Sequence, residues 1–229
     1  MGVFLTAEWH WLLMVNYEID PEILRPYVPP GVALDTWNGQ TFVSLVGFLF
    51  LDTRVLGLPI PFHRDFEEVN LRFYVRRVID GQTRRGVVFI KEIVPKTAIA
   101  AVARWIYHEN YVALPMSHRI DEDEVEYSWG RSNRIRSRRH GEPFLAAEGS
   151  QEEFITEHYW GYTAQPDGGC LEYRVEHPKW RLWKLAEVVV NCEAEQIYGA
   201  HFQVPLRSKP ASAFLAEGSG VSVFRGRKI

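Results

Sequence analysis

The chain has 229 residues, of which 46% are hydrophobic and 24% charged, and its formal net charge is −3. This is ordinary globular composition, sufficient for one domain over residues 1–229 with a sizeable core. The weakly acidic balance excludes a global basic field that would attract nucleic acid.

The two cysteines and the N-terminal stretch indicate a cytoplasmic protein. Cys170 and Cys192 are too few for a disulfide framework and show no metal-ligand spacing, so we expect reduced thiols. The N-terminal stretch is apolar, but it lacks a basic start and Glu8 and His10 interrupt it. It is therefore expected to be neither a signal peptide nor a membrane span.

The first third of the chain predicts a strand, a short helix and a second strand. Residues 8–19 alternate with period two, as a strand does. Asp20 is a good N-cap before a proline, and the helix should run through Tyr27. Asn38-Gly39 predicts a hairpin turn. The strand over 41–51 is apolar on both parities, which predicts a strand that is buried on both faces or lines a closed barrel.

The segment 56–63 is rich in glycine and proline and predicts a loop. Alternation returns over 66–77, followed by a turn at Asp80-Gly81, a second strand over 86–94 and a helix over 97–107.

The second half of the chain predicts further short strands and helices. Turn residues and alternation predict strands at 125–129, about 133–138, 170–177, 180–191 and 221–224. Ser150 and Glu153 form a capping box for a helix that should end near His158. Another short helix is expected within 192–202. About ten strands and three or four helices indicate a barrel-like, mainly β fold.

Several segments resemble the YqjF-like family of uncharacterised bacterial proteins, in the order of that family and over nearly the whole chain. These segments are 27–31, 38–43, 66–75, 86–89, 103–104, 154–159 and 175–180. The most specific are the E-x-N-L-R-x-Y-V run that begins at Glu68 and the V-x-H-P-x-W run that begins at Val175.

That family is similar in fold to acetoacetate decarboxylase. The resemblance implies a mainly β (α+β) fold: a closed antiparallel cone-shaped β-barrel with a ligand cavity and a few short peripheral helices. In the decarboxylase a lysine forms a Schiff base with a keto acid. The counterpart segment begins near Ala103 and Arg104 and contains no lysine, so decarboxylation by that route is not expected.

One face of the strand 66–77 is polar and carries the main site candidates. Glu68, Asn70, Arg72 and Tyr74 share this face, and the other face is apolar. A solvent-exposed polar face and a cavity-lining one are both compatible with the pattern. Glu68 stands where the related decarboxylases carry a pocket glutamate. We expect Glu68 and Arg72 to bind a ligand, with Glu68 a candidate catalytic acid or base.

Lys91 is a second catalytic candidate, because a desolvated lysine has a lowered pKa and is a nucleophile. Parity places it with Val87, Phe89 and Ile93. The alternative is a lysine at a strand end whose amine reaches solvent or an acid.

The helix over 97–107 and the residues after it supply three more ligand-binding candidates. Arg104, Tyr107 and Tyr111 are expected on a polar, aromatic cavity wall. The alternative is that the aromatic rings belong to the core.

The arginine-rich segment 131–140 has two interpretations. A nucleic-acid patch is one, but exposed cross-strand pairing with the acidic segment 121–126 agrees better with the net charge. The eight histidines show no metal-binding spacing, and we expect neither a metal nor another cofactor.

Two functions follow. The chain binds a small organic molecule in its cavity, or it is an enzyme that acts on a keto-acid-like or other small carboxylated substrate. We expect no nucleic-acid or membrane partner, and a homo-oligomer is compatible with the related folds.

Overall fold

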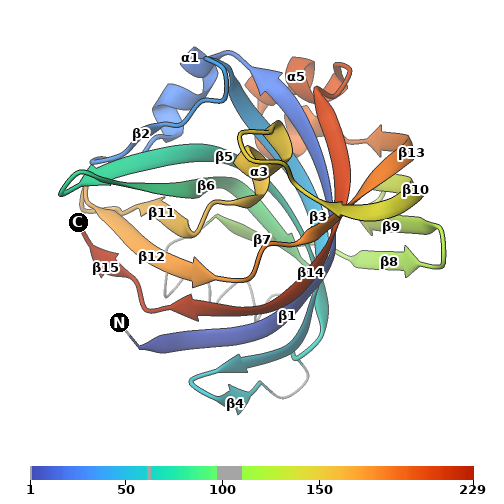
Figure 1. Cartoon of the computed structure of the whole chain (residues 1–229), viewed down its shortest axis with the longest axis horizontal. Coiled ribbons are helices and arrows are strands. Elements are labelled where there is room, and N and C mark those ends of the chain that lie inside the picture. Colours follow the sequence, from blue (N-terminus) through green and yellow to red (C-terminus); the bar gives the residue numbers. More distant parts are fainter. Residues whose placement is uncertain (1, 61–62, 97–109) are drawn as a thin grey trace.

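A computed structural model describes residues 2–60, 63–96 and 110–229, and most of them belong to one twisted β-sheet (Figure 1). The strands are β1 Val3–Ile19, β2 Ala33–Leu34, β3 Thr41–Val55, β4 Leu58–Pro59, β5 Phe66–Ile79, β6 Gln82–Val94, β7 Tyr111–Ala113, β8 Met116–Ile120, β9 Glu124–Trp129, β10 Asn133–Leu145, β11 Trp160–Ala164, β12 Cys170–Glu176, β13 Arg181–Asn191, β14 Ser212–Phe224 and β15 Arg227–Lys228.

The sheet follows the order β15-β12-β11-β6-β5-β3-β1-β14-β13-β10-β9-β8. The neighbours β5 and β6 form the hairpin predicted around Asp80-Gly81, and β3 pairs antiparallel with both β1 and β5. A further antiparallel pairing joins β12 to β14 through Val175 with Val223 and Glu176 with Ser222. Two strands that stand far apart in the order are thus direct neighbours.

The helices are short and several gather at one end of the molecule, opposite β4 (Figure 1). They are α1 Pro21–Leu24, the 3-10 turn Arg25–Tyr27, α3 Gln151–Thr156, α4 Ala194–Tyr198, the 3-10 turn Ala200–Phe202 and α5 Gln203–Arg207. Both predicted caps are confirmed: Asp20 accepts a hydrogen bond from the backbone N–H of Glu22, and Ser150 accepts one from that of Glu153. The predicted helix 97–107 lies outside the described residues.

The two faces of the central strands are both buried. On β5, Val69, Leu71 and Phe73 pack in one apolar cluster, together with residues of β9, β10 and α5. Phe66 and Tyr74, on the opposite face, belong to a second cluster with residues of β3 and α3. The prediction that strand 41–51 is buried on both faces is confirmed, since each of those residues up to Phe50 is buried.

Several predicted element boundaries were wrong, and some strands were missed. The last strand begins at Ser212 rather than Val221, the strand that begins at Asn133 continues to Leu145, and β11 was missed. The segment 212–220 is rich in small residues, and its strand conformation depends on pairing with β1, whose register runs from Asn16–Ser212 to Val3–Phe224. Such pairing is not visible in local propensity.

A buried carboxylate connects the C-terminal strand to the β5–β6 hairpin. Glu172 on β12 is fully buried. It pairs with Arg77 (3.0 Å), Arg84 (2.8 Å) and Arg227 (2.9 Å). Burial alone would raise the pKa of Glu172, but hydrogen bonds from Arg227 and Arg77 hold it below its usual value. One side chain thus links its own strand, β12, to β5, β6 and β15.

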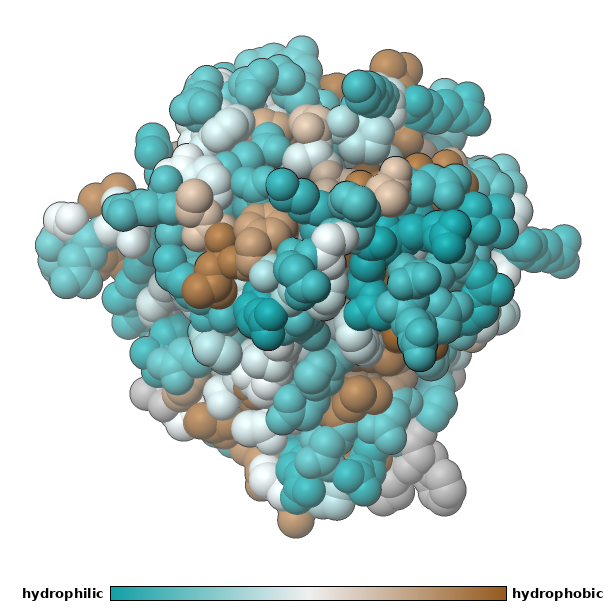
Figure 2. All heavy atoms as spheres, turned by 45° about the vertical axis from the view of Figure 1, so that its right-hand side comes forward, coloured by the Kyte–Doolittle hydropathy of each residue, from teal (hydrophilic) through white to brown (hydrophobic). Residues whose placement is uncertain are grey.

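The face of the molecule shown in Figure 2 is mostly hydrophilic, with small hydrophobic patches. The arginines of β10 face the acids of β9, as in the pairs Arg134–Glu126 (3.8 Å) and Arg136–Glu124 (3.9 Å). The cross-strand pairing interpretation of 131–140 is therefore confirmed. No helix in the described part of the chain combines the length and the apolar character that crossing a bilayer requires.

Candidate functional site

A cavity of about 240 Å³ lies beside the second apolar cluster. Its wall is rich in aromatic residues, which include Trp9, Phe48, Phe50, Phe66, Trp160 and Trp180. The rings contact one another: Phe50 stacks on Phe66 with centroids 4.7 Å apart, and Trp9 meets Phe50 edge-on at 5.5 Å. Such a wall, with a few polar groups, is typical of small-molecule sites.

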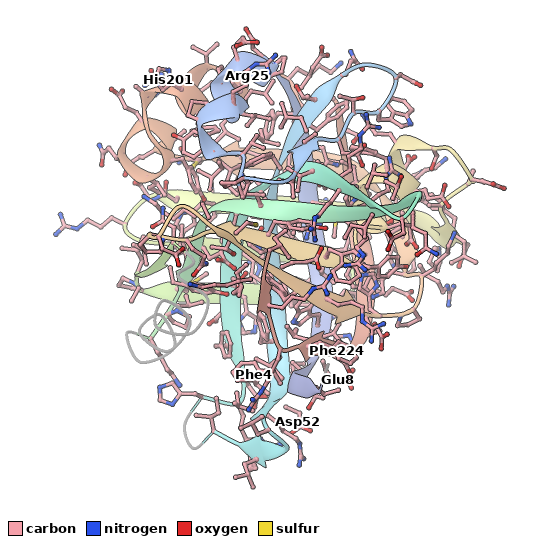
Figure 3. All side chains as sticks on the ribbon, turned by 90° about the vertical axis from the view of Figure 1, so that its left-hand side faces the viewer. Phe4, Glu8, Arg25, Asp52, His201 and Phe224 are labelled. Atoms are coloured by element: carbon pink, nitrogen blue, oxygen red, sulfur yellow. The ribbon has the colours of Figure 1, made fainter. Side chains whose placement is uncertain are left out.

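One part of the cavity wall lies at the end of the molecule away from the helices. Phe4, a lining residue, appears near Phe224 and Asp52 in Figure 3, whereas Arg25 and His201 mark the opposite, helical end.

The polar face of β5 lines this cavity. Glu68, Asn70 and Arg72 are all lining residues. Asn70 donates a hydrogen bond to Glu68 Oε1 (2.9 Å), and the hydroxyl of Tyr111 donates to Glu68 Oε2 (3.3 Å). Glu68 is 2% exposed, so these donors replace water around its carboxylate. Three sequence candidates, Glu68, Arg72 and Tyr111, are thus brought together.

Arg72 is the one lysine or arginine among the described residues of this wall. One terminal nitrogen lies 3.9 Å from the sulfur of Met14, and its guanidinium carbon lies 6.0 Å from the ring centre of Tyr74. Its buried Nε has no hydrogen-bond acceptor, and no carboxylate in the described ranges forms an ion pair with it. A guanidinium carries five donors, so this group has capacity for an anion.

The position predicted for Lys91 was wrong. Residues up to Phe89 and from Lys91 pair regularly with β5, but Ile90 is an extra residue, which makes a β-bulge. Val87, Phe89 and Glu92 therefore line the cavity, whereas Lys91 does not. The Lys91 amine donates to the carbonyl of Ile197 in α4. Partial burial lowers the pKa of Lys91. The amine, however, lies on the side of the strand away from the cavity.

Glu92 is a site residue that the sequence did not indicate. It is 2% exposed and faces the cavity opposite Asn70 on the neighbouring strand. Strict alternation assigns it to the same side as Val88 and Ile90, and only the bulge turns it inward.

Asp35 and His158 are two further site residues that the sequence analysis did not indicate. His158, just after α3, lines the cavity, and its Nε2 lies 3.4 Å from Asp35 Oδ2. Burial lowers the pKa of His158 to about 4, and the nearby Asp35 carboxylate opposes this only in part. The residues are far apart in sequence, and no local motif joins them.

His177 and Trp180 complete the aromatic wall. Their rings stack 4.0 Å apart at 14°, and Trp180 donates from Nε1 to Ser219 (2.8 Å). The H-P-x-W run therefore forms a turn that is fixed by packing of Trp180. Burial lowers the pKa of His177 as well.

Two of the ligand-binding candidates, Arg104 and Tyr107, lie outside the described residues. All six lysines of the sequence lie within them, and none is among the cavity-lining residues. Within the described ranges, no group of three or more histidine, cysteine, aspartate or glutamate side chains is arranged to hold a metal ion.

The fold is shared with several solved structures. The acetoacetate decarboxylase of Legionella pneumophila subsp. pneumophila str. Philadelphia 1 has a TM-score of 0.67 at 14% identity, covering 99% of this chain and 87% of that one. The enduracididine biosynthesis enzyme MppR, in complex with pyruvate, has a TM-score of 0.68 at 11% identity, and the match covers 100% of this chain and 91% of that one. These likenesses show that the chain has an acetoacetate decarboxylase-like fold, as predicted.

Sequence comparison is more specific. The uncharacterized protein YqjF of Bacillus subtilis (strain 168) is 31% identical over 199 residues, which are 83% of this chain and 80% of that protein. The profile of the DUF2071 family, described as an uncharacterized conserved protein, matches residues 6–220. The resemblance predicted from the sequence motifs is confirmed, and the chain belongs to the DUF2071 family.

Proposed function

We propose that this chain binds a small carboxylated organic molecule in the aromatic cavity, with Arg72 holding the carboxylate. The observation that carries the proposal is the guanidinium of Arg72, which lies on a largely apolar wall without a described carboxylate partner. Hydrogen bonds between ionised partners are the strong ones, and a planar guanidinium matches a carboxylate.

The proposed ligand is small. A cavity of about 240 Å³ corresponds to roughly eight water molecules at about 30 Å³ each. The stacked rings of Phe50 and Phe66 favour a flat, apolar body. Phenylacetate, an aryl ring with one carboxylate, is a suitable probe.

We also propose that the sheet closes into a barrel. The pairing of β12 with β14 supports it, because the pairings β12-β11-β6-β5-β3-β1-β14-β12 then make a circuit. A closed sheet would leave no free strand edge along this circuit.

Equilibrium binding tests the carboxylate site. Isothermal titration should show that the chain prefers phenylacetate over phenylacetamide, the uncharged analogue. Arg72→Gln should weaken phenylacetate binding by about 1.5–3 kcal/mol, roughly tenfold to a hundredfold, while phenylacetamide changes little. Arg131→Gln, at an exposed turn position, is the matched control and should bind as the native chain does. Equal loss in both variants would contradict the proposal.

The second candidate function is an enzyme on a keto-acid-like substrate, with Glu68 as acid or base. The pyruvate complex of MppR favours it, because that protein shares the fold. Borohydride reduction with a panel of 2-oxo acids, followed by mass spectrometry, tests only the version of this enzyme in which a lysine forms a Schiff base. The binding function predicts no lysine adduct, as no described lysine lines the cavity. A trapped lysine lost in Lys91→Ala would favour Schiff-base chemistry.

A further inference from the structure

Asp35 determines which hydrogen-bonding group the His158 ring presents to the cavity. Asp35 is 2% exposed and accepts hydrogen bonds from Arg85 Nε (2.8 Å) and from the backbone N–H of Thr36 (3.0 Å). Burial alone would raise its pKa, but hydrogen bonds from His158 and Arg85 lower it. Asp35 is therefore a carboxylate at neutral pH and has no hydrogen to donate.

The ionised state of Asp35 determines the tautomer of His158. Nε2 of His158 faces Asp35 Oδ2 at 3.4 Å, and a carboxylate favours a nitrogen that carries a hydrogen. Burial lowers the pKa of His158 to about 4, so the ring is neutral at pH 7. A neutral imidazole has one N–H, which places a bare lone pair on Nδ1.

Nothing in the described protein supplies a hydrogen to that lone pair. Both ring nitrogens are buried without a hydrogen-bond partner of good geometry, but Nε2 lies 3.4 Å from the Asp35 carboxylate, which leaves Nδ1 as the nitrogen to be satisfied. The adjacent hydroxyl of Tyr74, whose ring lies 4.7 Å from that of His158, is committed elsewhere. Ser44 donates to Asn16 Oδ1 (2.6 Å), so the contact between Ser44 and Tyr74 (2.5 Å) uses the hydrogen of Tyr74.

A buried acceptor without a donor costs about 1–3 kcal/mol unless something in the cavity satisfies it. We propose that Nδ1 of His158 accepts a hydrogen bond from a hydroxyl group of the ligand whose carboxylate Arg72 holds. The ligand class is thereby narrowed to hydroxy-substituted carboxylates. This inference rests on the proposed function and makes His158 a specificity-determining residue.

Two of the charges near His158 favour a hydroxyl over an ammonium. The charges of Arg85 and Arg72 lower the pKa of His158, which means that each disfavours a positive charge at the ring, whereas the charge of Asp35 acts in the opposite direction. A neutral donor avoids this repulsion, and a site that pairs with a hydroxyl discriminates against the analogue that lacks it.

The tautomer is tested on the native chain without any ligand. Two-dimensional long-range ¹H–¹⁵N spectra of ¹⁵N-histidine-labelled protein report which ring nitrogen carries the hydrogen, and His158→Gln assigns the signal. The expected result at pH 7 is a neutral ring with hydrogen on Nε2. A protonated ring, or hydrogen on Nδ1, would overturn the proposal even if carboxylates bind.

The ligand class is tested with pairs that differ by one hydroxyl: mandelate against phenylacetate, and 3-phenyllactate against 3-phenylpropionate. At least one hydroxy acid should bind the native chain roughly tenfold more tightly than its partner. His158→Phe, which keeps a ring between Tyr74 and Phe154, should abolish that preference and leave the deoxy acid unchanged.

The outcomes separate the two proposals. If deoxy acids bind through Arg72 and neither pair shows a preference that depends on His158, the hydroxyl inference is refuted and the carboxylate site stands. If no carboxylate binds in a manner that depends on Arg72, the proposed function itself has failed.

Discussion

Replacing His158 by phenylalanine should change how stability depends on pH. The native pKa of His158 is about 4, against 6.5 for an ordinary histidine. Between these values the unfolded chain binds a proton that the folded chain does not. The contribution of His158 to the free energy of unfolding is therefore largest above pH 6.5 and is lost as the pH falls toward about 4.

The magnitude follows from the shift. A difference of about 2.5 pKa units, at about 1.4 kcal/mol per unit, makes the native chain lose about 3 kcal/mol across this window because of His158. The Phe variant cannot titrate at this position and should lack that loss. The groups whose charges or hydrogen bonds act on the ring are Asp35, Arg85 and Arg72.

The assay is urea-induced unfolding of both proteins at several pH values from about 7 to about 4.5. The quantity to compare is the difference between the two proteins at each pH, because titrations common to both cancel. His177, whose pKa burial also lowers, is one such common group. Asp35 loses its contact with His158 in the variant, but it keeps the hydrogen bond from Arg85, which also lowers its pKa. Parallel curves for the two proteins would refute the burial argument for His158.

Three other substitutions or reagents test the structure. Glu172→Gln leaves three arginines without their shared carboxylate, and urea unfolding should show a loss of about 3 kcal/mol. In Gly161→Ala the new Cβ would lie 2.0 Å from the ring of Tyr173, so thermal unfolding should show destabilisation of about 1–3 kcal/mol, and phenylacetate should bind more weakly. Burial raises the pKa of Cys170 to about 11 and that of Cys192 to about 12, so iodoacetamide at about pH 8 should label both thiols at least about a hundredfold more slowly than in urea.

The elements that position the site could be predicted from the sequence, because caps, turns and alternation each involve residues that are close together in the chain. Asp20 caps α1 and Asn38-Gly39 turns the chain before β3, as the sequence indicates. The alternation of β5 separated Glu68 and Arg72 from the apolar side chains correctly. Alternation could not say which side faces a cavity, since both sides of this strand are buried.

The rest of the site depends on contacts between distant segments. Asp35 and His158 meet only because the residues after β2 and those after α3 converge, and each residue has an ordinary local setting. Glu92 required knowledge of a bulge, which inserts one residue without a distinctive composition. These are tertiary effects that override the periodicity on which the prediction depended.

The bulge at Ile90 has a consequence for the charge of the cavity. Lys91 and Glu92 are adjacent and opposite in sign, and a pleated strand can turn only one of them inward. A backbone irregularity of a single residue selects the carboxylate. Without the bulge, Lys91 rather than Glu92 would face the cavity. The formal charge at that point of the wall would then differ by two units with no change in the sequence. The electrostatic character of this interior is thus encoded partly in strand register, and an alignment of residue types alone would not reveal it.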